Sequence, residues 1–236
     1  MTLSRVLLFV ALVAAVLLLL AGPGSRMQWW EFRTGFELMR WATYLGLAVA
    51  AVSLFALLLP RLRRRSAGKL AIALVLALAV VVMPLQGMRT ARSVPPIHDI
   101  TTDTADPPLF QAILPLRATA PNGSDYAGDE VAAQQRQAYP DLQPLRLPED
   151  PATAFARALA AAQASGWEIV ASDPATGRIE ATATTRWFGF KDDVVVRVRS
   201  QDKGSVIDVR SMSRVGRSDL GANARRITGY LERLQQ

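Results

Sequence analysis

The chain has 236 residues, of which half are hydrophobic, with a net charge of +7, one histidine and no cysteine. The absence of cysteine excludes disulfides and zinc–thiolate sites, and a histidine-based metal cluster or Ser–His–Asp triad would depend on His98 alone. Residues 1–89 contain ten Lys/Arg against two Glu, whereas residues 90–236 contain 17 Lys/Arg against 18 Asp/Glu. The basic excess therefore belongs to the hydrophobic third, where it reports membrane topology, and nucleic acid is not an expected partner.

Residues 1–89 contain three apolar runs, at about 3–21, 41–59 and 70–86. Each run approaches the roughly 20 residues that a helix needs to cross the hydrocarbon core of a bilayer. The first run could also be a signal peptide, but no clear cleavage site follows it and two more runs come after it. The sequence therefore predicts a membrane domain of three transmembrane helices with an uncleaved first span.

The stretch RLRRRSAGK, residues 61–69, lies between the second and third predicted spans. Such clusters mark the cytoplasmic side, so we expect a multi-pass inner (plasma) membrane protein with a cytoplasmic N-terminus and a periplasmic C-terminal domain. The same cations could also bind the headgroups of anionic lipids in the bilayer. Aromatic residues between the first two spans are expected to form an interfacial belt.

Residues 90–149 are predicted to form an extended, acidic, proline-rich segment. Residues 93–150 contain nine prolines, and nine Asp/Glu against three Arg give them a net charge of −6. Prolines at this density exclude helices of ordinary length from most of the segment. The segment is either a linker or a cover for the following domain, residues 151–236, whose net charge is +4.

Residues 150–236 predict an α+β domain in two layers. Asp150–Pro151 starts a helix that Gly166 ends, four strands follow, and Asp219–Leu234 is a second helix. Period-two alternation with short loops favours a four-stranded antiparallel sheet covered by helices on one face. The residues expected to face the helices are Trp167, Ile169, Ala171, Ile179, Ala181, Ala183, Thr185, Trp187, Val194, Val196, Val198, Ile207 and Val209.

The other face of the predicted sheet is charged, and two interpretations of it stay open. Its residues are Glu168, Glu180, Thr182, Thr184, Arg186, Arg197, Arg199, Asp208 and Arg210. Opposite charges on adjacent strands are typical of a solvated face. Alternatively, the acidic segment covers this face, and the arginines are paired internally with Asp99, Asp103, Asp192 or Asp208.

The corner between the last strand and the last helix is the candidate ligand site. Arg210, Arg214, Arg217 and Ser218 could bind an anion beside free backbone N–H groups at a helix start. A capping side chain at Ser218 or Asp219 would compete with such a ligand.

The sequence contains no catalytic constellation. Asp192 and Asp193 are neighbours in a strand and point to opposite faces, so turn chemistry or an arginine partner is expected for them rather than a shared metal. His98 with Asp99 and Asp103 is a weak cluster, and no phosphate-binding glycine loop or metal-ligand spacing occurs. We therefore expect no catalytic residues, no metal, no cofactor and no enzyme activity.

Several separated stretches carry a family resemblance: IHDITTD followed by PP, then AYPDLQPL, FGFKDDVVVRVR and DVRSMSRVGRSDLGANARRI. Over about residues 90–236 the chain resembles the domain of unknown function 1499 family, and its helical part is similar to the multi-span bacterial members. The resemblance implies a membrane-anchored or exported domain and assigns no active site. The predicted function is binding of an anionic ligand, a lipid headgroup or phosphate, and the alternative is a structural or assembly component of the envelope that contacts other envelope proteins.

Overall fold

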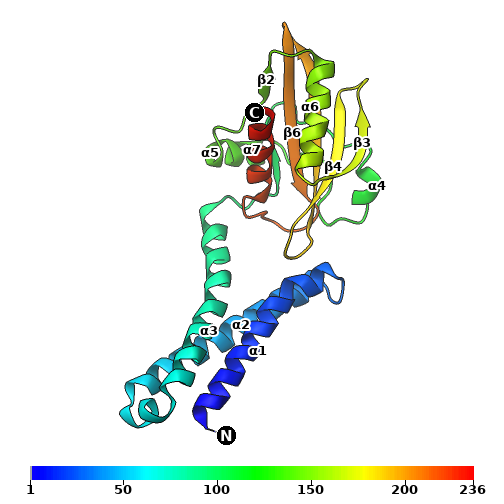
Figure 1. The fold of residues 1–236 in the computed structure, drawn as a ribbon. Coiled ribbons are helices and arrows are strands. Elements are labelled where there is room, and N and C mark those ends of the chain that lie inside the picture. Colours follow the sequence, from blue (N-terminus) through cyan, green and yellow to red (C-terminus); the bar gives the residue numbers. More distant parts are fainter. Residues whose placement is uncertain (1) are drawn as a thin grey trace. The chain divides into compact units, whose positions relative to one another are not determined.

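A computed structural model describes residues 2–236 and divides them into two compact units. The helical unit comprises residues up to Thr90 together with Arg186–Gly189. The sheet unit comprises Ala91–Thr185 and Phe190–Gln236. Figure 1 shows the elements of both units along the chain.

The helical unit contains α1 (Leu3–Arg26), α2 (Phe32–Leu58) and α3 (Pro60–Ser93), whose last three residues belong to the sheet unit. All three are long and apolar enough to cross a membrane, as the three apolar runs predict. Each helix is longer than its predicted span. The basic stretch 61–69 is not a loop but the first turns of α3, because Pro60 occupies a helix start, where its missing N–H costs nothing.

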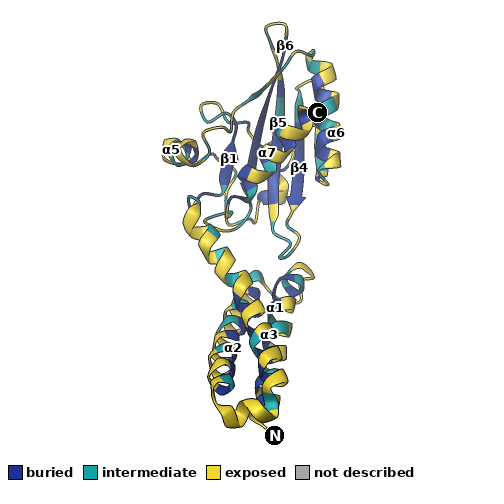
Figure 2. Ribbon diagram, turned by 60° about the vertical axis from the view of Figure 1, so that its left-hand side comes forward, coloured by how far each residue is buried: buried dark blue, intermediate teal, exposed yellow. Residues whose placement is uncertain are grey.

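Small residues line the contacts between these helices. The buried positions include Ala11 and Ala14 of α1, Ala42 and Gly46 of α2, and Ala77 of α3. A Cβ placed on Gly46 would lie 2.9 Å from Val81 Cγ2 and 3.1 Å from the Ala77 carbonyl oxygen. Such small residues let backbones approach closely, which is how helices associate in lipid. The outward surfaces of the helices are largely exposed and apolar (Figure 2).

The sheet unit contains six strands and four helices. In chain order they are β1 (Asp99–Thr101), α4 (Leu114–Arg117), α5 (Asp129–Ala138), β2 (Leu145–Leu147), α6 (Pro151–Ala164), β3 (Glu168–Asp173), β4 (Arg178–Thr184), β5 (Lys191–Gln201), β6 (Gly204–Ser213) and α7 (Ala222–Leu234). The sheet is antiparallel in the order β1-β6-β5-β4-β3, and β2 also pairs with β6.

The α+β class is confirmed, but the prediction of four strands is wrong because β1 and β2 come from the proline-rich segment. Both are three residues long and pair with β6, with Ile100 opposite Ser211 and Arg146 opposite Val206. The segment is therefore not uniformly extended, since it also forms α4 and α5. Three-residue strands carry too little alternation to be seen in a sequence.

One face of the sheet packs against α6 and α7, which lie side by side over it (Figure 1). This core face joins Ile179, Val196 and Val209 to Ala158 of α6 and Ile227 of α7. Asp150 caps α6 as predicted, because its carboxylate accepts the N–H groups of Ala152 and Thr153. The predicted core face is thus largely confirmed.

Three of the predicted inward residues are placed differently. The pairing of β3 with β4 shifts between Ile169 and Ala171, and this bulge puts Ala171 opposite Glu180 on the other face. Thr185 and Trp187 lie beyond the end of β4 at Thr184, in the turn that contains Gly189 at φ 72°. The chain reverses there because glycine adopts the left-handed conformation that the turn requires.

Candidate functional site

The second face of the sheet is buried beneath residues 103–124, which we call the strap. Phe110 and Ile113 of the strap pack with Val195 and Met212 on this face. The face is therefore neither solvated nor open, and Figure 2 shows β5 and β6 largely buried. Polar groups of the strap form hydrogen bonds with the charged side chains of this face.

Arg210 and Asp99 form a deeply buried ion pair on this face, with side chains 0% and 2% exposed. Arg210 Nε and Nη2 donate to the two Asp99 oxygens at 2.9 and 2.8 Å, a bidentate geometry. The remaining donors reach the carbonyl oxygens of Pro108 and Ser124 in the strap. The Arg210 guanidinium carbon also lies 4.8 Å from the centre of the Phe110 ring. Each nitrogen of this guanidinium group therefore donates to an acceptor inside the domain.

Asp193 lies between two arginines and a threonine. Arg117 of α4 donates to it at 2.7 Å, Arg214 donates through Nε and Nη2 at 2.8 Å each, and the Thr182 hydroxyl donates at 2.8 Å. Burial alone would raise the pKa of Asp193, but the hydrogen bonds from Arg214, Arg117 and Thr182 outweigh it and hold that pKa below its usual value. The same contact raises the pKa of Arg214. Asp193 is thus held as an anion.

Glu180 is a fully buried carboxylate, and among residues 2–236 no arginine lies within hydrogen-bond distance of it. Three consecutive strap N–H groups, from Gln111, Ala112 and Ile113, donate to it at 2.9 to 3.2 Å. Backbone N–H groups that converge in this way stabilise a negative charge. Glu180 therefore fixes the strap onto the sheet.

A fourth buried carboxylate is Asp208, which accepts from Arg197 at 3.1 Å and from Arg199 at 2.7 Å. Arg197 also donates to Asp106 of the strap at 2.9 Å, and both arginines lie 3.5 Å from Asp103. These contacts sit nearer the solvent than the Asp99 and Asp193 pairs, since Arg199 is 43% exposed. These contacts attach Asp103 and Asp106, at the start of the strap, to the sheet.

Asp192 points to the opposite face from Asp193, as the alternation of a strand predicts. Its carboxylate accepts from Arg226 of α7. Arg226 also contacts Asn223, whose amide oxygen accepts from the Ser211 hydroxyl at 2.7 Å and whose amide nitrogen donates to the His98 carbonyl at 3.0 Å. Of the two roles expected for these neighbouring aspartates, the arginine partner is therefore the one that the structure contains.

The four residues of the predicted anion site do not converge. Arg210 and Arg214 are bonded to Asp99 and Asp193, and only Arg217 is exposed. Arg217 lines a cavity of about 180 Å³ with His98 and Asp99. The Ser218 hydroxyl accepts the N–H of Leu220, and α7 begins after this corner at Ala222.

Asp219 occupies the helix start that an anion would need. Its carboxylate accepts the N–H groups of Gly221 and Asn223 at 2.7 and 2.8 Å. Burial raises the pKa of Asp219 despite these bonds. An incoming anion would meet this side chain before it met the free backbone N–H groups.

Residues that the sequence analysis overlooked carry much of this arrangement. Arg117, Tyr126 and Arg226 were not assigned to any site, yet Arg117 and Arg226 bind the two neighbouring aspartates. Tyr126 lies 5.5 Å from the Arg210 guanidinium, and burial raises the pKa of Tyr126 to about 12. Within residues 2–236 no group of three or more His, Asp or Glu side chains is arranged to hold a metal ion.

Comparison with known proteins gives one family match. A model of the family described as "Protein of unknown function (DUF1499)" matches residues 99–234. This range starts at β1 and ends at the last residue of α7, so it includes the strap and both ends of every ion pair on the sheet. A search of curated proteins finds no match.

Proposed function

Since this chain belongs to the DUF1499 family, which carries no assigned activity, we propose that it is a membrane-anchored assembly component of the cell envelope without catalytic activity. Three apolar helices anchor it, in our proposal in the inner membrane. The basic segment 61–69 then lies in the cytoplasm and the sheet unit in the periplasm. A reporter fused after Gln236 that is active only outside the cytoplasm tests this topology.

The pairing of arginines on the buried sheet face is the observation that carries the proposal. Arg117, Arg210 and Arg214 would be the natural anion binders, but all three are bonded to Asp99 or Asp193. A ligand would have to displace a buried carboxylate from its partner, at a cost of several kcal/mol. The arrangement therefore supports a rigid domain that presents a surface rather than one that opens to a substrate.

The outer side of the strap supports a surface of this kind. Leu109, Leu114 and Leu116 are 62%, 43% and 50% exposed, whereas Phe110 and Ile113 between them are buried. Exposed leucines concentrated in eight residues of a domain mark a contact surface more often than isolated ones do. We assign this surface to an envelope protein with a complementary apolar patch.

Photocrosslinking in intact membranes tests the assembly role, because the chain has no cysteine of its own. Leu114→Cys, labelled with a benzophenone maleimide, should give one adduct of defined size. Arg146→Cys, an exposed position on β2, is the matched control and should not give this adduct. The same adduct should disappear when Leu109→Asp and Leu116→Asp are added. An adduct insensitive to these changes, or none from Leu114→Cys, overturns the assembly role.

Anion binding remains the second candidate, and the exposure of Arg217 beside the His98–Asp99 cavity favours it. Here Arg217 and Ser218 would contact a small phosphate, with Arg210 and Arg214 holding the surrounding carboxylates. Thermal unfolding of the full chain with phosphate or glycerol phosphate tests this candidate. Stabilisation that Arg217→Ala abolishes and Arg233→Ala preserves supports it, and equal stabilisation of both variants rejects it.

A further inference from the structure

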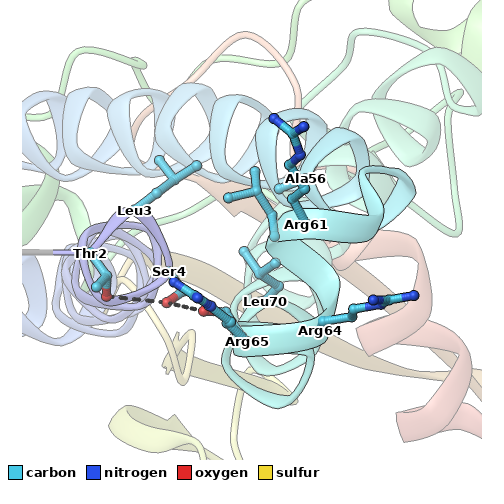
Figure 3. A pocket seen from close by; sticks show the side chains of 10 residues that line it. Thr2, Leu3, Ser4, Ala56, Arg61, Arg64, Arg65 and Leu70 are labelled. Carbon is cyan, nitrogen blue, oxygen red and sulfur yellow. Dashed lines mark hydrogen bonds between the residues drawn. The ribbon is translucent and has the colours of Figure 1, made fainter.

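A pocket of about 550 Å³ lies in the helical unit, where α1 begins, α2 ends and α3 begins (Figure 3). Leu7, Ala56 and Leu70, one from each helix, belong to a single packed cluster, which brings these three helix ends together. The volume is within the range of roughly 300–1,000 Å³ that small-molecule sites occupy. Leu3, Ala56 and Leu70 form its apolar part.

Hydroxyl groups line one side of the pocket. The Ser4 side chain is buried, and its hydroxyl donates to Ser66 Oγ at 3.2 Å across the α1–α3 contact. Thr2 Oγ1 lies 3.4 Å from Ser4 Oγ (Figure 3). Ser66 accepts in this contact and so keeps its own O–H to donate to a ligand.

Three cations line the same pocket, from Arg61, Arg64 and Arg65 at the start of α3. In Figure 3 the Arg65 side chain runs toward the hydroxyl groups, whereas Arg61 and Arg64 extend to other sides of the opening. All three are exposed, and in the described part of the chain no carboxylate lies within 4.0 Å of them. No neighbouring part of the sequence offers a carboxylate to these arginines, because residues 38–98 contain no Asp or Glu.

We propose that this pocket binds the phosphate group of an anionic phospholipid. Guanidinium groups bind phosphate oxygens in bidentate fashion, and Ser66 can donate a further hydrogen bond. The pocket lies at the ends of apolar helices, which is the depth at which lipid phosphates occur in a bilayer. Exposed Leu3 and Leu62 beside the cations offer contacts for the acyl chains. The apolar floor and the uncompensated cations fit a molecule with an anionic head and apolar tails.

Paired charge-removing variants test the proposal in the full-length protein. Arg64→Gln/Arg65→Gln removes two cations that line the pocket. Arg63→Gln/Lys69→Gln removes two exposed cations of the same segment that do not line it. Native mass spectrometry counts the phosphatidylglycerol retained from mixtures with phosphatidylcholine. The first variant should lose affinity for phosphatidylglycerol by about 25-fold, at roughly fivefold per cation, while the second stays within about fivefold of wild type.

Two further measurements complete the test. One distinguishes lipid phosphate from free phosphate, and the other detects a folding defect. Inorganic phosphate and glycerol phosphate are added as competitors. If they bind with the same variant dependence and phosphatidylglycerol shows no preference over phosphatidylcholine, the lipid assignment is overturned. Equal losses in the two variants also overturn it, because they indicate diffuse charge attraction. Arg64→Lys/Arg65→Lys keeps the charge and should restore part of the affinity, which a misfolded bundle would not do.

Discussion

The arginines on the buried sheet face, Arg117, Arg210 and Arg214, meet carboxylates, whereas the arginines at the start of α3 line a pocket without one. Arg210 is fully buried and bonded to Asp99 at 2.8 Å, while Arg65 is exposed and has no carboxylate within 4.0 Å in the described residues. Both groups of cations come from one chain, but they differ in what neutralises them. Local charge density therefore does not by itself locate an anion site. What matters is whether the fold supplies the counter-charge.

Removal of Asp99 should produce the largest change. Asp99→Asn leaves the Arg210 charge buried without its counter-ion and should lower the free energy of unfolding of the sheet unit by about 3–5 kcal/mol. Chemical denaturation monitored by near-ultraviolet circular dichroism measures the loss. The double variant Asp99→Leu/Arg210→Met removes both charges and should recover much of it. A double variant no more stable than Asp99→Asn would show that the pair is not the cause.

Acid should weaken the sheet unit next. The pKa of Asp193 is depressed in the folded state, so its contribution is present above the unfolded value of about 3.9 and is lost as the pH falls through the folded value. The free energy of unfolding measured from neutral pH down to about pH 3 should therefore decline. Asp193→Asn should flatten that decline. Asp219, whose pKa is raised, acts in the opposite sense, so Asp219→Asn should steepen the decline.

A smaller loss is expected at the exposed edge of the strap. Arg199→Gln removes one of two donors to Asp208, but Arg197 still neutralises this carboxylate at 3.0 Å. Because Arg199 is 43% exposed, the cost should be about 1 kcal/mol or less. The Tm of the variant measures it. A loss as large as that of Asp99→Asn would mean that this exposed ion-pair cluster stabilises the domain as much as the buried Arg210–Asp99 pair does.

The smallest change is expected in the helical unit. Arg61→Gln should change the free energy of unfolding by about 0.5 kcal/mol or less. The reason is that Arg61 has no carboxylate within 4.0 Å in the described residues. The Tm of the protein in neutral detergent measures this change. Arg40→Gln, which breaks an exposed pair with Glu37, is the control of equal charge. Marked destabilisation by Arg61→Gln alone would reveal a structural role for the cation.

The sequence predicted the core face of the sheet well, because this face follows simple periodicity. Asp150 followed by Pro151 predicted the start of α6, and alternating valines predicted β5 around Val196. The number of strands was underestimated, since β1 and β2 are short and their partner lies more than 50 residues away in sequence. Pairing at that distance leaves no local pattern.

The candidate site was less predictable, because it depends on what covers the sheet. A charged residue such as Glu180 or Arg210 gives the same sequence pattern on a solvated face as on a covered face. Only the contacts of the strap show that this face is covered. The net charge of the acidic segment is consistent with its covering the charged sheet face, but it does not predict which carboxylate pairs with which arginine. Arg117 in particular sits in a four-residue helix with no distinctive pattern around it.

The placement of β6 near the C-terminal end has a consequence for the order of folding. β6 pairs with β1, β2 and β5, and it supplies Arg210 to an aspartate 111 residues earlier. A ribosome therefore releases the strap and β1 long before their partner strand exists. Contacts so distant in sequence slow folding, because the entropy of closing a long loop is lost before the contacts form and stabilise the chain. The strap should remain a substrate for proteases until β6 has emerged, which makes pairing of β6 with β1 and β5 the step that commits the domain to its native state.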